Sequence, residues 1–270
     1  MSKRKCFVLL AVMGLACLIL TACTQTSNSP LQKIQAKKEL IVATAAVNPY
    51  PPFEFQKVID GKNQIVGSDI DLANEIGKEL GVKVKIENMD FNNVLTSVQS
   101  GKADIAIAAL SKTAAREKSF DFSTIYFQDG NVLVVKKSNL ATYTSVESLS
   151  GKQIAAPVGT IQENVVKTQF KNSVDVGLQD SSSSFIEAQT GKVAAACVDE
   201  VVGEQFVAAN PDMAIAKIKV SDEGASGFAV AMPKNSGTLK TKINSIIARL
   251  QAKGTLNQWV QNNIKLSTEK

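Results

Sequence analysis

The segment IAALSKTAAREKSFDFS, residues 107–123, contains the clearest candidates for ligand chemistry, because Ser111 and Arg116 follow directly after an apolar run. A guanidinium group suits a carboxylate, to which it donates two parallel charge-assisted hydrogen bonds. Ser111 can add a hydroxyl or a backbone N–H donor. The alternative is that Arg116 forms a surface ion pair with Glu117 or Asp121, a contact that contributes only ~0–1 kcal/mol.

The segment PVGTIQEN, residues 157–164, can recognise an anion at the start of a helix. Thr160 and Glu163 have the spacing of a capping box, and Gly159 lets the backbone approach a ligand closely. The free N–H groups of a helix N-terminus attract a carboxylate. The alternative is a plain capped helix with no ligand.

Asp199 ends the apolar run VAAACV in the second half of the chain, at the place that Ser111 and Lys112 occupy in the first half. A carboxylate there can accept hydrogen bonds from a ligand ammonium group. Together, Arg116 and the helix start at Thr160 match the carboxylate of an α-amino acid, and Asp199 matches its ammonium group. A ligand held from both halves would favour a closed arrangement of two lobes.

Two aromatic residues are candidates for the walls of a pocket. Tyr50 lies in the proline-stiffened loop NPYPPFEF, residues 48–55, and Phe91 follows the end of a predicted strand. Phe53 and Phe55 in the same loop are expected in the core. For Phe91, a core position under a helix is the alternative to ligand contact.

The order of predicted elements repeats along the chain and indicates two similar α/β lobes. Hydrophobic periodicity predicts strand, helix, strand, helix, strand in each half. The first set covers residues 39–46, 67–81, 82–89, 91–101 and 104–110, and the second covers 152–159, 160–170, 174–180, 181–191 and 192–198. Such βαβ progressions imply mostly parallel sheets that are covered on both faces.

The N-terminus has the pattern of an export signal. Residues 1–22 combine a basic start with an apolar stretch that is too short for a comfortable membrane span. The sequence LTAC that ends at Cys23 resembles a bacterial lipobox, in which this cysteine carries lipid and becomes the first residue; an ordinary signal peptide is the alternative. Residues 23–37 are predicted to be a flexible tether to the membrane.

Composition excludes several classes of function. Removing the three basic residues of the signal from the 30 in the chain leaves 27 against 25 acidic residues, a formal charge of +2, and no basic stripe predicts nucleic-acid binding. The chain has no histidine, which excludes Ser-His and Cys-His catalysis and any metal site with a histidine ligand. Cys197, the one cysteine beyond Cys23, is expected to be a buried apolar residue. We expect no cofactor.

These motifs together resemble those of the amino-acid-binding lipoproteins of bacterial ABC importers, a branch of the periplasmic-type solute-binding proteins. The similarity covers the chain from about Glu39 to Ile264. It is carried by YPPFEF, GSDIDLANEIGKELG, SGKADIAIAALSKTAAREKSFDFS, GTIQE and GKVAAACVDE.

The resemblance implies an α/β, two-lobed fold of the periplasmic-binding-protein type II class, in which two crossover strands form a hinge. The crossovers are expected near residues 128–131 and 220–226. Residues 38–129 would form the first part of lobe 1 and residues 130–222 would form lobe 2. Residues 223–270 would return to lobe 1.

The resemblance also implies a ligand site with Arg116 on the carboxylate, Asp199 on the ammonium group, and aromatic walls around the ligand side chain. The expected site residues are Tyr50, Phe91, Ala109, Leu110, Ser111, Arg116, Thr160, Ile161, Gln162 and Asp199. Val47, Ala109 and Ile161 replace residues that are common in binders of basic amino acids. These departures remove the obvious partner for a charged side chain, so an uncharged amino acid is as plausible as a cationic one.

The resemblance implies a monomeric receptor, lipid-anchored on the extracytoplasmic face of the cell membrane, that delivers a free L-amino acid to an ABC permease and its ATPase. The alternative is an enzyme on the same fold, of the dehydratase or peptidoglycan lyase type, with Glu54 or Glu163 as a general acid. A third class, the sensing module of a receptor, would need a transmembrane segment and a signalling domain.

Overall fold

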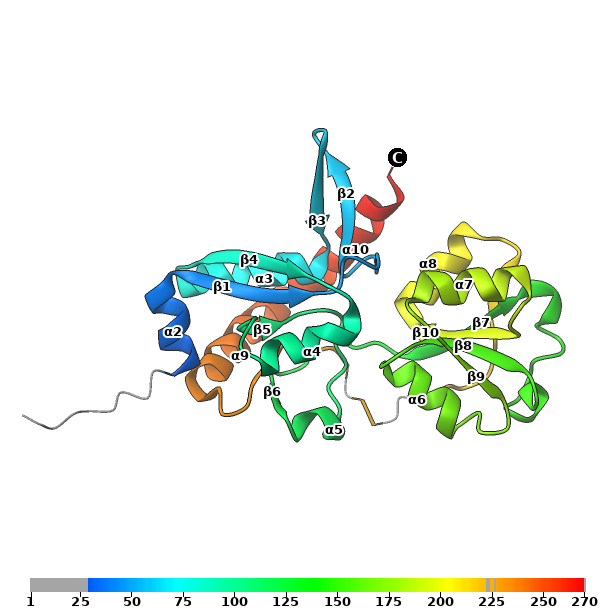
Figure 1. Ribbon diagram of the computed structural model, residues 1–270. Helices are drawn as coiled ribbons and strands as arrows, with labels where there is room; N and C mark the ends of the chain where they lie inside the picture. The colour runs from blue at the N-terminus through cyan, green and yellow to red at the C-terminus, as the bar shows by residue number, and fades with distance from the viewer. Residues whose placement is uncertain (1–28, 222–223, 226, 270) are drawn as a thin grey trace, which may run out of the picture.

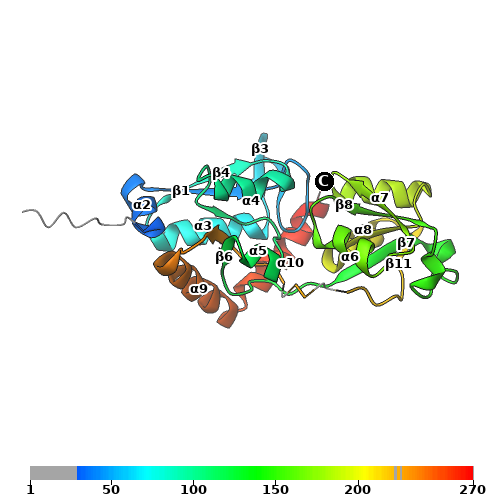
Figure 2. The ribbon, with the colours of Figure 1, turned by 60° about the horizontal axis from the view of Figure 1, so that its bottom comes forward.

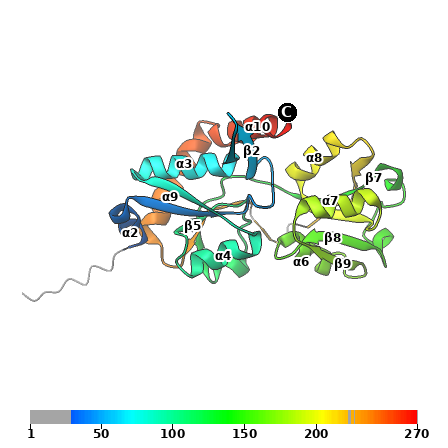
Figure 3. The same cartoon turned by 45° about the horizontal axis from the view of Figure 1, so that its top comes forward.

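The computed structural model describes residues 29–221, 224–225 and 227–269, which form two α/β lobes joined by two chain crossings (Figure 1). The predicted signal peptide and the predicted lipidation site, Cys23, lie outside the described residues. Figures 2 and 3 show the two lobes side by side from two further directions. Within the described ranges, we find no helix that combines the length and the apolar character needed to cross a membrane.

The first lobe contains a five-stranded sheet that helices cover on both faces. Its strands, in order across the sheet, are β4 (Lys83–Asn88), β1 (Glu39–Thr44), β5 (Ile105–Ala106), β12 (Ala231–Pro233) and β6 (Phe120–Phe122). Its helices are α2 (Pro30–Lys37), α3 (Ser68–Leu80), α4 (Phe91–Gln99), α5 (Ala114–Glu117), α9 (Gly237–Ala252) and α10 (Thr255–Thr268). Alternate residues of β1 divide between two core clusters, one with α3, α9 and α10 and the other with α4.

The second lobe repeats this design. Its strands, in order, are β11 (Met213–Ile215), β7 (Asn131–Lys136), β10 (Ala195–Asp199), β8 (Gln153–Pro157) and β9 (Val174–Leu178). Its α-helices are α6 (Ile161–Thr168), α7 (Ser181–Thr190) and α8 (Glu200–Ala209), and two short 3₁₀ helices cover Lys137–Asn139 and Glu147–Leu149. Cys197 is fully buried in this lobe, and burial raises the pKa of its thiol, which fits the predicted apolar role.

The two sheets have the same connectivity at their centres, which explains the repeated sequence pattern. In lobe 1, β1 lies parallel to β4 and β5, and in lobe 2, β8 lies parallel to β9 and β10. Each lobe then adds one antiparallel strand. In lobe 1 this strand is β12, from the C-terminal tail, which pairs with β5. In lobe 2 it is β7, from the first crossover, which pairs with β10. The carboxyl ends of the parallel strands in both lobes face the gap between them (Figure 1).

The two crossovers run antiparallel beside each other. Phe228 donates its N–H to the Phe127 carbonyl at 2.8 Å and accepts the N–H of Tyr126 at 2.9 Å. Farther into lobe 2, the Asn131 amide donates to the carbonyl of Ser221 at 2.7 Å. The prediction of two crossovers therefore agrees with the structure, although the second predicted segment, 220–226, lies partly outside the described residues.

Two features of lobe 1 differ from the sequence predictions. The predicted tether, residues 23–37, is wrong for residues 30–37, which form α2; Ile34 of this helix is fully buried in the core and Ser29 caps its first turn. The hairpin of β2 (Phe55–Ile59) and β3 (Lys62–Val66) was not predicted, although its loop, Asp60-Gly61, is a dipeptide typical of tight hairpin turns. Gly67 ends this hairpin at φ 132°, and a Cβ there would lie 2.0 Å from the Phe53 carbonyl oxygen, so only glycine fits.

Candidate ligand-binding site

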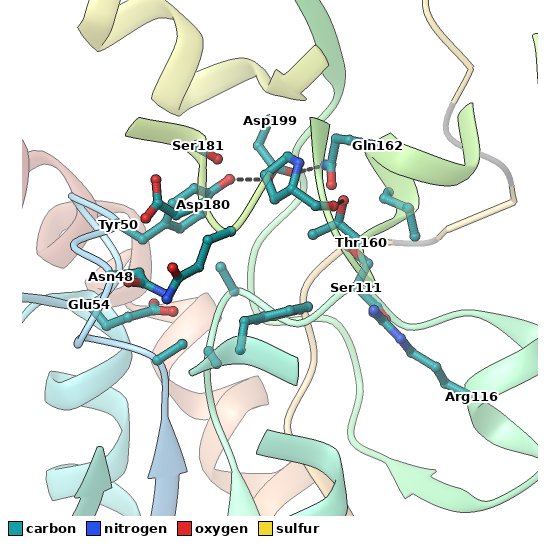
Figure 4. A pocket seen from close by; sticks show the side chains of 17 residues that line it. Asn48, Tyr50, Glu54, Ser111, Arg116, Thr160, Gln162, Asp180, Ser181 and Asp199 are labelled. Carbon is teal, nitrogen blue, oxygen red and sulfur yellow. Dashed lines mark hydrogen bonds between the residues drawn. The ribbon is translucent and has the colours of Figure 1, made fainter. Parts of the chain in front are cut away.

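A pocket lies between the carboxyl ends of the two sheets, where open α/β sheets bind ligands. It encloses about 570 Å³, part of which is open to solvent. Except for Leu110, every predicted site residue lines it: Tyr50, Phe91, Ala109, Ser111, Arg116, Thr160, Ile161, Gln162 and Asp199 (Figure 4). The tertiary structure thus brings together residues that are up to 149 positions apart.

Leu110 does not line the pocket, and its inclusion in the site was wrong. Its side chain is 1% exposed and packs in the core cluster that contains α4, and its carbonyl accepts the N–H of Ala229 at 3.0 Å. The chain bends at Ala109, whose backbone is left-handed, and this bend turns Leu110 into the core while Ala109 and Ser111 line the pocket.

Arg116 is held at the boundary between the lobes by backbone carbonyls. Its guanidinium group donates to the carbonyl of Ser111 at 2.7 Å and, across the gap, to the carbonyl of Gly159 at 3.2 Å. It also lies 6.0 Å from the ring centroid of Phe91, within reach of a cation–π contact. Burial lowers the pKa of Arg116 to about 10, although Asp199 opposes this change.

The alternative role of Arg116, a surface ion pair, is absent from the described structure. Glu117 instead pairs with Lys112 at 3.1 Å, and Asp121 pairs with Lys234 at 3.7 Å. Since neither acid neutralises Arg116, its charge remains available to a ligand carboxylate.

Thr160 begins α6 and directs the N-terminus of this helix at the pocket. Its hydroxyl accepts the N–H of Glu163 at 3.2 Å and donates to the Pro157 carbonyl at 2.7 Å. The Glu163 carboxylate accepts the N–H of Gly159 at 2.8 Å, one residue earlier than in a standard capping box. The predicted helix start is confirmed, and its free N–H groups and dipole favour an anion.

Asp199 is buried at the opposite wall, in contact with both lobes. It accepts a hydrogen bond from Tyr50 Oη of lobe 1 and another, at 2.8 Å, from the Gln162 amide of lobe 2. The same amide nitrogen lies 2.7 Å from Asn131 Oδ1, so Gln162 orients Asp199. Burial raises the pKa of Asp199 to about 6, and the hydrogen bonds from Tyr50 and Gln162 oppose this rise.

The end of the pocket away from Arg116 contains polar residues that the expected set omitted. Asn48 and Glu54 come from lobe 1, and Asp180 and Ser181 come from lobe 2 (Figure 4). Gln179 of lobe 2 also lines the pocket. The lobe 2 residues follow the end of β9, so the rule that ligands bind at the carboxyl ends of strands could have identified them.

Ala109 adopts a backbone conformation that is unusual for a residue with a side chain. Its φ is 43°, in the left-handed region that non-glycine residues seldom occupy. The buried Asp69 carboxylate accepts the Ala109 N–H at 2.6 Å. This contact stabilises the turn that brings Ala109 and Ser111 to the pocket.

Comparison with known proteins identifies the family. Residues 40–265 match the bacterial extracellular solute-binding proteins, family 3. The chain belongs to this family. Within it, the chain is 30% identical over 263 residues to the arginine-binding extracellular protein ArtP of Bacillus subtilis, covering 94% of this chain and 96% of ArtP. It is also 30% identical over 227 residues to the L-cystine-binding protein TcyJ of Escherichia coli, covering 84% and 82%.

Solved structures of relatives have the same fold. An amino acid ABC transporter substrate-binding protein, AbpA of Streptococcus pneumoniae, bound to L-arginine, has a TM-score of 0.83 and 45% identity, covering 88% of this chain and 100% of AbpA. The ancestral amino-acid-binding protein AncCDT-1, a precursor of cyclohexadienyl dehydratase, has a TM-score of 0.77 and 27% identity, covering 87% and 99%.

These similarities confirm the predicted two-lobed type II fold and the predicted function at the level of the family. The protein is a solute receptor of the ABC-transporter type that binds amino acids. The relatives named above that carry a curated function are transport binding proteins. Glu163, considered above as a general acid, accepts hydrogen bonds from Lys167 and Gly159 N–H that lower its pKa despite burial, which does not suit that role.

Proposed function

We propose that the protein binds L-arginine between its lobes and delivers it to an ABC permease at the outer face of the cell membrane. The observation that carries this proposal is the charge of the pocket. Among the described residues, its charged lining consists of one cation, Arg116, and three acids, Glu54, Asp180 and Asp199. Arginine has one anionic and two cationic groups and therefore complements this lining, whereas an uncharged side chain offers no positive charge to Glu54 and Asp180.

The positions of these charges suit the length of arginine. Its α-carboxylate would bind Arg116 and the N-terminus of α6, and its α-ammonium group would bind Asp199. Glu54 and Asp180 lie on the side of the pocket away from Arg116 (Figure 4), where the guanidinium group would reach. Tyr50 and Phe91 would pack against the alkyl stem.

This assignment revises the expectation that the protein lacks a partner for a charged side chain. Val47, at the place where relatives that bind basic amino acids often carry an acid, is 41% exposed and does not line the pocket. Glu54 and Asp180 bring carboxylates to the pocket from other elements. The names of ArtP and of the L-arginine complex of AbpA also support arginine.

Calorimetric titration tests the proposal. Protein freed of bound ligand by unfolding and refolding would be titrated with L-arginine, L-lysine, L-histidine, L-cystine, citrulline and agmatine. We expect the tightest binding for arginine. Citrulline offers no positive charge to Glu54 and Asp180, and agmatine leaves Arg116 without a carboxylate, so each should bind at least a hundredfold more weakly than arginine, a difference of about 3 kcal/mol. Tighter binding of an uncharged amino acid would overturn the assignment.

We also propose that lipid on Cys23 anchors the protein to the membrane. The export signal and lipobox in residues 1–23 support this proposal. The helix α2, where the described chain begins, lies at the end of lobe 1 away from lobe 2 (Figure 1), so an anchor there would leave the gap between the lobes accessible. Replacement of Cys23 by serine should abolish incorporation of labelled palmitate and release the protein from the membrane fraction; unchanged fractionation would contradict the anchor.

A further inference from the structure

Two acidic side chains lie in contact beneath the far end of the pocket. Glu54 is 1% exposed and Asp69, at the start of α3, is fully buried, and the two carboxyl groups hydrogen-bond to each other. Such a bond requires that one of them carries a proton. Among the described residues, no lysine or arginine forms an ion pair with either acid.

The surrounding hydrogen bonds indicate where that proton lies. Asp69 accepts the Ala109 N–H at 2.6 Å, and the Tyr126 hydroxyl lies 2.9 Å from each of its oxygens. These donors stabilise a charged Asp69, so Glu54 is the acid that donates. The second Glu54 oxygen, Oε2, is buried without a hydrogen-bond partner, and Figure 4 shows the carboxyl group directed toward the pocket.

We propose that Glu54 holds a proton in the empty site and releases it to solvent when the guanidinium group of the ligand arrives, so that binding of arginine expels one proton. This inference rests on the proposed function, because it needs a cationic ligand side chain. The free Glu54 oxygen would then accept a hydrogen bond from the guanidinium group, which replaces the proton as the positive charge between the two acids.

Burial supports this protonation state. It raises the pKa of Glu54 well above its usual value, and the charge of Asp69 adds to the rise. The pKa of Asp69 is raised to about 7, mainly by burial, while the bonds from Ala109 and Tyr126 oppose the rise. A ligand cation in the same space lowers the pKa of both acids.

Other titratable groups surround the pair. The charge of Asp199 in β10 raises the pKa of Glu54, and the charge of Asp71 in α3 raises the pKa of Asp69. Tyr50 and Tyr126 have pKa values raised above 10 by burial and stay neutral. Asp199 faces the α-ammonium end, which every α-amino acid shares, so its protons are released equally by arginine and by citrulline.

The proton can be counted by calorimetry. The full-length chain, purified and freed of ligand, would be titrated with arginine at pH 6.5 in several buffers that differ in ionisation enthalpy. The slope of binding enthalpy against ionisation enthalpy gives the protons released. We expect arginine to release up to one proton more than citrulline, which has the same shape and the same α-groups but no side-chain charge.

Two variants identify the source of this proton. Glu54→Gln mimics the protonated acid and should bind arginine more weakly with no extra release, whereas Asp180→Asn should weaken binding but keep the release. Arginine bound by the wild type without extra release, or extra release that persists in Glu54→Gln, would overturn the inference and leave the proposed function intact. If citrulline binds too weakly, the arginine data for wild type and Glu54→Gln decide alone. Failure of arginine to bind would overturn both proposals.

Discussion

At the scale of single residues, Arg116 differs from Arg249 because no ion pair with an acid is found for it among the described residues. The chain has three arginines, Arg4, Arg116 and Arg249. Arg249 pairs with two acids of α3, Glu75 at 2.7 Å and Glu79 at 3.1 Å. Within the described part of the chain, the guanidinium group of Arg116 donates to two backbone carbonyls and faces an aromatic ring, and it forms no ion pair. The positive charge of Arg116 is half-buried at the pocket, where it would pair with a ligand carboxylate.

We therefore predict that Arg116→Ala lowers the affinity for arginine about a hundredfold or more. Loss of one partner from a buried, hydrogen-bonded charge pair costs about 2–5 kcal/mol, and each 1.4 kcal/mol is about a tenfold change in affinity. Calorimetric titration measures this change. Arg249→Ala is the matched control and should keep the wild-type affinity, because its ion pairs lie away from the pocket; an Arg116→Ala variant with wild-type affinity would contradict the assignment.

At the scale of elements, α2 shows how a polar, weakly amphipathic segment becomes part of the core. It presents one buried side chain, Ile34, to lobe 1, where the helix lies against α9 and β1. Its remaining side chains are exposed or half-buried, which is why its composition resembles a tether. The capping box of Ser29 and Gln32 stabilises its first turn.

We predict that Ile34→Ala destabilises the protein by about 2–4 kcal/mol, because it leaves a cavity in the core, and leaves ligand affinity unchanged. Urea unfolding followed by circular dichroism measures the loss, and calorimetry measures the affinity. Gln35→Ala on the exposed face of α2 is the control and should change stability by less than about 0.5 kcal/mol. Equal stability of both variants would show that α2 does not support lobe 1.

The turn before α6 is an element of lobe 2 that lies close to lobe 1. Gly159 has a φ of 79°, and a Cβ there would lie 2.5 Å from Asn92 Oδ1 of α4 in lobe 1. We predict that Gly159→Ala weakens arginine binding because the added methyl group hinders the approach of the lobes. Adding Asn92→Ala should restore affinity by removing the opposing side chain.

Gly151→Ala separates the steric effect from backbone strain. Gly151 has a similar φ of 70° but no atom within 4 Å of a Cβ, so alanine there carries the same strain of roughly 1 kcal/mol without an interlobe contact. Calorimetry of the single and double variants measures the change in arginine affinity, and thermal unfolding measures the loss of stability from backbone strain. Equal affinity losses for Gly151→Ala and Gly159→Ala would contradict the steric explanation.

At the scale of the whole molecule, several buried acids lie around and beneath the pocket between the lobes. Besides Asp69 and Asp199, Asp129 on the first crossover has its pKa raised to about 8, mainly by burial and then by the charge of Asp199. Its Oδ1 accepts N–H groups of Gly130 and Val201, whereas its Oδ2 is buried without a partner. The proposed cationic ligand would interact favourably with these acids from both lobes and would thereby favour a closed arrangement of the lobes.

We predict that the ligand-free protein loses stability as the pH rises from about 5 to about 8. Acids with a raised folded pKa bind more protons in the folded than in the unfolded chain over this window, so unfolding becomes easier as these protons are lost. Glu75 and Glu163 have lowered pKa values. Their effect on stability has the opposite sign, but it occurs only at pH values below the usual pKa range of a glutamate. Thermal unfolding at several pH values measures the trend.

Asp129→Asn provides the control for this trend. Its Oδ1 can still accept the two N–H groups, but the side chain no longer ionises. The variant should therefore show a smaller fall in Tm between pH 6 and 8, and saturating arginine should reduce the fall in the wild type. A wild-type Tm that is constant or rises from pH 5 to 8 would contradict the prediction.

Features that depend on residues close together in the chain could be predicted from the amino-acid sequence alone. Hydrophobic periodicity specified the repeated helices and strands, and the ends of predicted strands marked Ser111, Arg116, Thr160 and Asp199, because parallel strands present their carboxyl ends at one edge. These signals arise within one strand or one turn of helix, so they can be recognised without the fold.

Two features depend on the tertiary structure: whether a given side chain faces the core or the pocket, and which residues distant in sequence come into contact. The bend at Ala109 placed Leu110 in the core, and docking against β1 and α9 made α2 part of lobe 1. The β2–β3 hairpin brought Glu54 against Asp69, and the approach of lobe 2 brought Asp180 to the pocket. Such contacts form between segments distant in sequence, because the free energy that stabilises them comes from burial in the completed fold.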